Sequence, residues 1–139
     1  MLVVGLLQHL VARRRAPTTT SRVAGAALTA ASAAMLGGAV SRFRSQRTTV
    51  DPVHVDRVDQ LVTTGPNSVS RNPMYVGMAG VLLAHAVWRR SLPALLPVAG
   101  FVAVMDRTQV AVEEAALREH FGQEYDAYCR RVPRWIGPA

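Results

Sequence analysis

Residues 64–77 read TGPNSVSRNPMYVG and join a polar loop to a long apolar segment. The Gly-Pro-Asn triplet at 65–67 consists of residue types that favour turns. Asn72 can cap a helix with its side-chain oxygen, and Pro73 suits the first helical position, where no intrahelical N–H is needed. The stretch therefore predicts a turn followed by a helix that begins at Pro73. Three side chains should stand at the mouth of this helix: Arg71, Asn72 and Tyr75.

Apolar blocks separated by arginine-rich loops flank this stretch on both sides. Residues 23–40 contain no charged side chain and are rich in Ala and Gly, which allows close packing against other helices. Residues 73–88 and 92–112 are also apolar, and Pro97 should kink the second of these segments. Residues 1–12 are apolar too, but twelve helical residues reach only about 18 Å, short of a bilayer core of about 30 Å. We expect them to form a short or partly inserted helix.

This block pattern predicts an all-α integral membrane bundle of three to four membrane helices with a cytoplasmic C-terminal helical cap. No sustained alternation of apolar and polar residues indicates a sheet. The 139 residues leave room for a single domain. Within it, residues 1–63 supply N-terminal membrane helices and a polar linker, and residues 64–139 supply a loop, a helical hairpin and the cap. Pro52 interrupts the linker, whose apolar residues fit either a strand or an amphipathic turn: Val53, Val55, Val58, Leu61 and Val62.

The net charge of +7 comes from a chain whose basic residues other than histidine are all arginine. Such a charge suggests nucleic-acid binding, but the arginines stand at the ends of apolar blocks and no aromatic residues interleave with them. Anchoring to anionic lipid headgroups explains this placement better, so we expect membrane lipid and no nucleic acid as a partner. Cys129 is the sole cysteine, and the four histidines lack zinc-type spacing, so no metal site is expected.

The hairpin should return the chain to the side on which it began, placing Glu113 and Glu114 beside Arg71. An amphipathic tail follows, with one helix that ends at Gly122 and another over residues 123–131. Three aromatic residues of this tail fall on one face, at positions i, i+4 and i+7: Phe121, Tyr125 and Tyr128.

A resemblance to a known family rests on four short pieces in this order: RNPMYVG at 71–77, EEAAL at 113–117, FGQEY at 121–125 and VPR at 132–134. The ordered set resembles the isoprenylcysteine carboxyl methyltransferases, their bacterial relatives and the phospholipid N-methyltransferases. Their shared pattern reads roughly Arg-His-Pro-x-Tyr-x-Gly, Glu-Glu-x-x-Leu, Phe-Gly-x-x-Tyr and Pro-Arg. The match covers about residues 61–136. Asn72 departs from the pattern, because it stands where the family commonly has His and cannot titrate near neutral pH.

The resemblance implies an S-adenosylmethionine-dependent methyltransferase that acts on a lipophilic small molecule at the membrane interface. In that family the Arg-His-Pro-x-Tyr loop and the Glu-Glu helix wrap the cofactor. Carried over to this chain, the residues expected to act in catalysis are Arg71, Glu114 and Arg134. Those expected to bind the cofactor are Asn72, Pro73, Tyr75, Gly77, Glu113, Glu114, Tyr125 and Tyr128. Their chemistry is suitable, because a sulfonium donor with an amino-acid end needs carboxylates, a cation and aromatic walls.

The acceptor should be ionised before it binds. The loop and the tail offer no obvious His–carboxylate pair that could deprotonate an alcohol or an amine. A carboxylate, phenolate or thiolate needs no such base, and Arg71 or Arg134 could hold its charge.

Arginine placement also predicts the orientation. Residues 42–47, Arg71 and residues 130–131 fall on the same side as the expected site, which the positive-inside rule makes cytoplasmic. The chain's size and arginine-only composition suggest a bacterial inner membrane. The arginines of residues 13–22 fall on the opposite side and depart from the rule.

Each feature has a plainer interpretation by itself. The 71–77 stretch is typical of a capped membrane helix with a flanking arginine, and the glutamate pair is typical of a helix start. The tail tyrosines fit an interfacial aromatic belt, and Arg134 fits a lipid anchor. Only the occurrence of all these features in this order favours the methyltransferase interpretation.

Two other functions stay open. One is a nicotinamide-dependent membrane reductase of the sterol-reductase type, although the loop has one arginine rather than the several that phosphate binding would favour. The other is a non-catalytic small membrane interaction protein, which the short first helix and the missing histidine allow.

Overall fold

The computed structural model describes residues 1–12, 16–45 and 60–138, and every regular element in these ranges is a helix. The six α-helices are α1 (Leu2–Val11), α2 (Thr19–Ser45), α3 (Pro73–Trp88), α4 (Leu95–Arg107), α5 (Gln109–Phe121) and α6 (Gln123–Cys129). Two short 3₁₀ turns accompany them within the described ranges: η2 (Gly65–Ser68) and η3 (Leu92–Ala94). The all-α prediction is confirmed for these residues. Three linker residues of the strand-or-turn prediction, Val53, Val55 and Val58, lie outside the described residues, and the other two, Leu61 and Val62, lie in neither a helix nor a strand.

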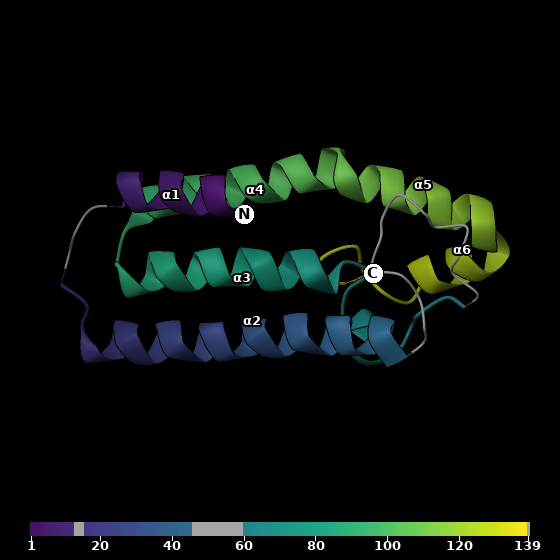
Figure 1. Ribbon diagram of the computed structural model, residues 1–139, viewed down its shortest axis with the longest axis horizontal. Coiled ribbons are helices and arrows are strands. Elements are labelled where there is room, and N and C mark those ends of the chain that lie inside the picture. The colour runs from purple at the N-terminus through teal and green to yellow at the C-terminus, as the bar shows by residue number, and fades with distance from the viewer. Residues whose placement is uncertain (13–15, 46–59, 139) are drawn as a thin grey trace.

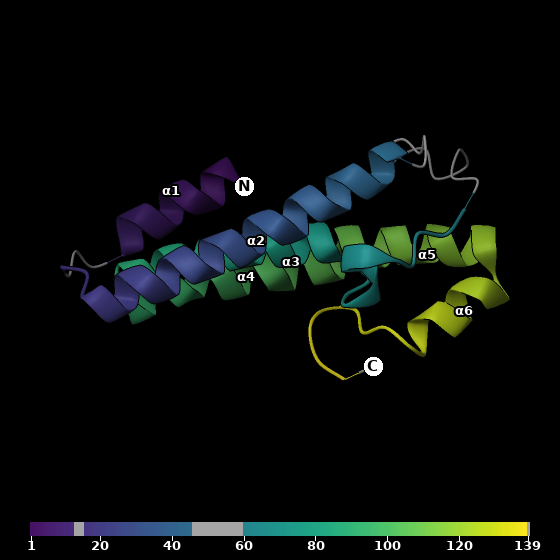
Figure 2. The same ribbon diagram turned by 90° about the horizontal axis from the view of Figure 1, so that it is seen from below.

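The helices α2, α3 and α4 lie side by side and alternate in direction (Figure 1). The end at which α2 stops and α3 begins is called the site end, and the end at which α3 stops and α4 begins is called the far end. At the site end α5 continues roughly along α4, and α6 folds back beneath it (Figure 1). The short helix α1 packs against α4, η3 and α3 and lies apart from α2 (Figure 2).

Small residues allow α2 and α3 to approach closely, as the sequence predicted. A Cβ atom added at Gly25 of α2 would lie 3.1 Å from Cε3 of Trp88 at the end of α3. A Cβ atom added at Gly77 of α3 would lie 2.6 Å from Cγ of Leu36 in α2. Larger residues at these positions would push the helices apart, so glycine sets the spacing of this pair.

Two helical stretches among the described residues are long and apolar enough to cross a membrane. They are Thr19–Arg42, with 24 residues, and Leu92–Phe121, with 30 residues. The helices Leu2–Val11 and Pro73–Trp88 are apolar but shorter. The first agrees with the expected short N-terminal helix. The predicted count of three to four crossings and the cytoplasmic placement of the cap stay predictions.

The hairpin and the tail differ in detail from the sequence prediction. The chain turns at Arg90, with a φ of 49°. Pro97 lies in the first turn of α4, where a missing N–H is tolerated, so the kink predicted there is absent. The break comes at Thr108 instead, with φ and ψ of −109° and −80°. Gly122, with a φ of 51°, separates α5 from α6 as predicted.

Candidate functional site

The C-terminal tail binds the loop that precedes α3. The backbone N–H of Arg71 donates to the Pro133 carbonyl at 2.9 Å. The Ser70 hydroxyl and the Asn72 amide both donate to the Arg134 carbonyl at 3.0 Å. Three hydrogen bonds thus connect residues separated by more than sixty positions in the chain. This contact fixes the position of the Arg134 side chain relative to Arg71.

Asn72 occupies the N-cap position of α3 and Pro73 the first helical position, as predicted. The predicted side-chain cap is wrong, because the Asn72 side chain makes no capping hydrogen bond. Its amide group is directed at the tail, where it finds the Arg134 carbonyl. The residue therefore joins the loop to the tail instead of closing the helix end.

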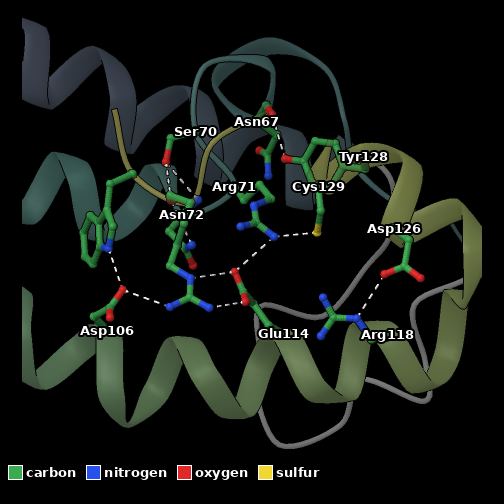
Figure 3. Close-up of polar contacts among 12 residues, drawn as sticks. Asn67, Ser70, Arg71, Asn72, Asp106, Glu114, Arg118, Asp126, Tyr128 and Cys129 are labelled. Atoms are coloured by element: carbon green, nitrogen blue, oxygen red, sulfur yellow. Dashed lines mark hydrogen bonds and ion pairs between the residues drawn. The ribbon is translucent and has the colours of Figure 1, made fainter. Parts of the chain in front are cut away.

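Glu114 is the centre of the site and is only 6% exposed. Arg134 donates two hydrogen bonds to it, from Nε to Oε1 at 3.0 Å and from Nη2 to Oε2 at 2.6 Å. Arg71 approaches from the other side, with Nη1 3.2 Å from Oε1 (Figure 3). The structure thus brings together all three residues predicted to act in catalysis. One buried carboxylate thus holds two guanidiniums, and such contacts between charged groups are stronger than hydrogen bonds between neutral ones.

Two residues that the sequence prediction missed extend this network. Asp106 accepts from Arg134 Nη1 at 3.2 Å and from the Trp135 indole at 2.8 Å. These contacts, above all the hydrogen bonds to Glu114, raise the pKa of Arg134 above its usual range. Asp106 lies about two helical turns before Glu114, so an acidic residue inside an apolar segment was the available signal.

Glu113 faces a different neighbour from Glu114. Its Oε1 accepts from the Tyr75 hydroxyl at 2.7 Å and from the Gln109 amide at 3.0 Å. Consecutive residues of a helix point about 100° apart, which explains why the two glutamates serve different partners. Glu113 and Tyr75, both predicted to bind the cofactor, are therefore in direct contact and connect α5 to α3.

The two tail tyrosines are buried, with Tyr125 1% and Tyr128 3% exposed. They pack with Val132 and with the partly buried Phe121. Tyr128 donates to the Asn67 carbonyl at 2.6 Å, and burial raises its pKa to about 12. Burial also raises the pKa of Tyr125. Both phenols are therefore protonated near neutral pH and form a wall beside the ion pairs, not an exposed belt.

Two buried polar atoms beside this network lack a hydrogen-bond partner within the described part of the chain. They are Nε of Arg71 and Oδ1 of Asn67. The Asn67 side chain extends toward Arg71 in Figure 3. Arg71 meanwhile uses its Nη1 on Glu114 and on the Cys129 sulfur. An unused donor and an unused acceptor thus lie on two buried side chains of the segment before α3. The sequence analysis had identified Asn67 only as a turn residue.

Gly77 and Pro73 are the remaining residues predicted to bind the cofactor. Both are buried at the start of α3, and Gly77 lies against Leu36 of α2. These contacts explain a role in packing and leave the predicted role in binding untested. Among the described residues, no group of three His, Cys, Asp or Glu side chains could hold a metal ion.

Comparisons with known proteins identify the family of this chain. The family model of phospholipid methyltransferases matches residues 20–124. A protein of Haemophilus influenzae, described only as uncharacterized, is 38% identical over 63 residues, which make up 45% of this chain and 100% of that protein. No solved structure matches the chain. Because the family model spans well over half of its residues, the chain belongs to the phospholipid methyltransferase family, a family of membrane methyltransferases.

Proposed function

We propose that this membrane methyltransferase uses S-adenosylmethionine as its donor and methylates a lipophilic acceptor at the membrane interface. One observation supports this most. The buried Arg71–Glu114–Arg134 centre adjoins an unused donor and an unused acceptor, Arg71 Nε and Asn67 Oδ1. Buried polar groups without partners are costly, so a ligand that satisfies both would gain from binding there.

The amino-acid end of S-adenosylmethionine fits this requirement. Its carboxylate needs a donor, which Arg71 Nε would supply, and its ammonium needs an acceptor, which Asn67 Oδ1 would supply. Glu114 and Arg134 then act through Arg71, because they hold its guanidinium in place. Tyr125 and Tyr128 would border the purine. The further predicted contacts are Asn72, Pro73, Tyr75, Gly77 and Glu113.

When bound, the cofactor supplies an electrophilic methyl group on a sulfonium. The residues of this chain would align the acceptor with that group and exclude water, which are the main catalytic resources for an in-line displacement. The tail contributes to the exclusion, because residues 133–134 close over the loop before α3.

The acceptor would arrive already ionised, as a carboxylate, phenolate or thiolate. Tyr125 and Tyr128 are protonated, since burial raises their pKa values. Both carboxylate oxygens of Glu114 already contact guanidinium groups, so neither is free to face an acceptor. The family description points to phospholipids, and a phospholipid amine would have to enter without its proton.

The site end would face the cytoplasm of a bacterial inner membrane. Arginines are more numerous at the site end among the described residues, which fits the positive-inside rule. Those in the tail and the loop before α3 are Arg71, Arg130, Arg131 and Arg134. Those at the far end are Arg22, Arg89 and Arg90.

The test combines binding and turnover on the full chain in detergent. Calorimetric titration with S-adenosylmethionine should show saturable binding that weakens about tenfold or more in Arg71→Ala, because a charged hydrogen-bond partner is lost. The control is Arg130→Ala, which removes an exposed arginine of the same tail region and should bind normally.

Labelled donor is then offered with a panel of hydrophobic acids, phenols, thiols and amines. Methylation of acids, phenols or thiols, without a requirement for a protein base in the pH profile, supports the proposed acceptor class. Turnover of amines alone would contradict it, and an absence of donor binding would contradict the proposed reaction as a whole.

A further inference from the structure

A second polar cluster lies at the far end, away from the site. The His9 ring of α1 stacks on the His85 ring of α3, with centroids 6.1 Å apart and planes 29° apart. Arg89 follows one turn after His85, and its backbone N–H donates to the His85 carbonyl at 3.0 Å. The two imidazoles come from α1 and α3, and Arg89 follows at the end of α3, within electrostatic reach of His85.

The helix α1 is held rigidly against this cluster. Gln8 is 1% exposed, and its amide donates to the Leu82 carbonyl at 2.7 Å and to the Ala94 carbonyl at 3.0 Å. Gln8 immediately precedes His9, so these two hydrogen bonds also fix the position of that imidazole. The cluster is therefore set by buried contacts and not by chance proximity of surface side chains.

Arg89 has unused hydrogen-bonding capacity. Its Nε and Nη2 atoms are buried and have no hydrogen-bond partner in the described part of the chain. Every side-chain carboxylate in that part lies between Asp106 and Asp126, toward the site end. A guanidinium whose N–H groups are withdrawn from water without an anion is unfavourable, so this arrangement requires a negatively charged ligand.

The location indicates which anion is suitable. Trp88 and Arg90, neighbours of Arg89, are both exposed at the end of α3, and Arg22 is exposed at the start of α2. Exposed Trp and Arg at the ends of apolar helices mark the headgroup level of a bilayer, where the abundant anions are lipid phosphates. The planar fork of an arginine matches two phosphate oxygens.

We propose that His9, His85 and Arg89 form a binding site for the phosphate group of a membrane phospholipid, in the leaflet opposite the methyl-transfer site. This lipid is a structural ligand that would join α1 to the end of α3. The proposal is independent of the donor and of the methylated acceptor. It also gives a reason for the arginines at this end, which the positive-inside rule alone does not explain.

The experiment uses the full chain, stripped of lipid in a maltoside detergent. Calorimetric titration with monomeric dihexanoyl phosphatidylglycerol should show saturable binding to the wild type. Arg89→Gln should raise the dissociation constant about tenfold or more, because two charged hydrogen bonds are lost. Arg90→Gln is the matched control, since it removes the same charge from the exposed neighbour, and its dissociation constant should stay within about threefold.

A second variant keeps the test decisive if Arg89→Gln does not fold. His9 is exposed, so His9→Leu should fold, as thermal unfolding can verify, and should weaken lipid binding several-fold. Inorganic phosphate at the same concentration should bind more weakly than the lipid. Equal weakening by Arg89→Gln and Arg90→Gln would overturn the proposal in favour of diffuse attraction. Binding of inorganic phosphate as tight as that of the lipid, or no saturable lipid binding, would overturn it as well.

Discussion

The two ends of the bundle hold their arginines in opposite ways. At the site end, Arg134 makes three hydrogen bonds to Glu114 and Asp106, one through each of its three nitrogen atoms. At the far end, Arg89 keeps two buried nitrogen atoms without a partner in the described residues. The same residue type thus serves as a saturated structural element in one place and as an unsatisfied donor in the other. Arg71 lies between these extremes, because it pairs with Glu114 and still has a free Nε.

This difference in hydrogen bonding between the arginines indicates where ligands should bind. A saturated ion-pair network positions residues, whereas buried atoms without partners indicate a missing partner. By this criterion the donor should bind at Arg71 and Asn67, not at the more conspicuous Glu114–Arg134 pair. By the same criterion, Glu114 and Arg134 support the site, whereas Arg71 and Asn67 would contact the donor.

The largest effect is expected when the saturated network loses its centre. Glu114→Gln leaves two guanidiniums facing a neutral amide, which should lower the free energy of unfolding by about 3 kcal/mol, the cost of breaking a buried ion pair. Donor affinity should fall about tenfold or more, because Arg71 loses its anchor. Thermal unfolding and calorimetry measure the two effects. Glu119→Gln, on an exposed position of the same helix, is the control.

Removal of the unsatisfied acceptor, Asn67 Oδ1, should weaken donor binding with little change in stability. In Asn67→Ala the lost Oδ1 had no partner, so the free energy of unfolding should change by less than about 1 kcal/mol. The backbone carbonyl that accepts from Tyr128 stays in place. Donor affinity should nevertheless fall about fivefold to tenfold. Thr64→Ala, at an exposed nearby position whose side chain makes no capping hydrogen bond, should change neither quantity. A large loss of stability with normal donor binding would contradict the assignment of Asn67.

Local chemistry predicted the start of α3 but not its surroundings. Pro73 begins the helix as expected, since the preference of proline for this position depends only on nearby backbone. The Asn72 side chain was mispredicted because a distant carbonyl, that of Arg134, competes successfully for its amide. The break at Thr108 and the contacts of Asp106 with the tail were missed for the same reason. Sequence periodicity reports local structure and does not show which distant residues pair.

The convergence of Arg71, Glu114 and Arg134 was predictable because two kinds of inference agreed. The apolar hairpin returns the chain to its starting side, and the ordered motifs resemble a family whose loop and helix share one site. The family model matches only residues 20–124, so the position of Arg134 depends on the tail contacts instead. The number of membrane crossings was harder to predict, because two helical stretches among the described residues reach a spanning length and α3 is shorter.

A change at the far end should leave the site end unaffected. Gln8→Leu removes two buried hydrogen bonds between α1 and the hairpin, and should lower the free energy of unfolding by about 1–2 kcal/mol. Donor binding should be unchanged, because α1 packs against α3, η3 and α4, whereas Glu114 lies on α5 and Arg71 lies in the loop before α3. Gln123→Leu, an exposed glutamine at the start of α6, provides the control for stability. Weakened donor binding in Gln8→Leu would show that the two ends are coupled.

The smallest effect is expected at an ion pair that resembles the central one only in its geometry. Arg118 Nε lies 3.0 Å from Asp126 Oδ1, as close as Arg134 Nε is to Glu114, but the two side chains are 52% and 46% exposed. Water and salt screen such a pair, and holding two long side chains in one geometry offsets the attraction. Arg118→Gln, Asp126→Asn and the double variant should therefore unfold at the wild-type temperature. A coupling between the two changes as large as that measured between Glu114→Gln and Arg134→Gln would mean that distance, and not burial, determines the strength of ion pairs in this protein.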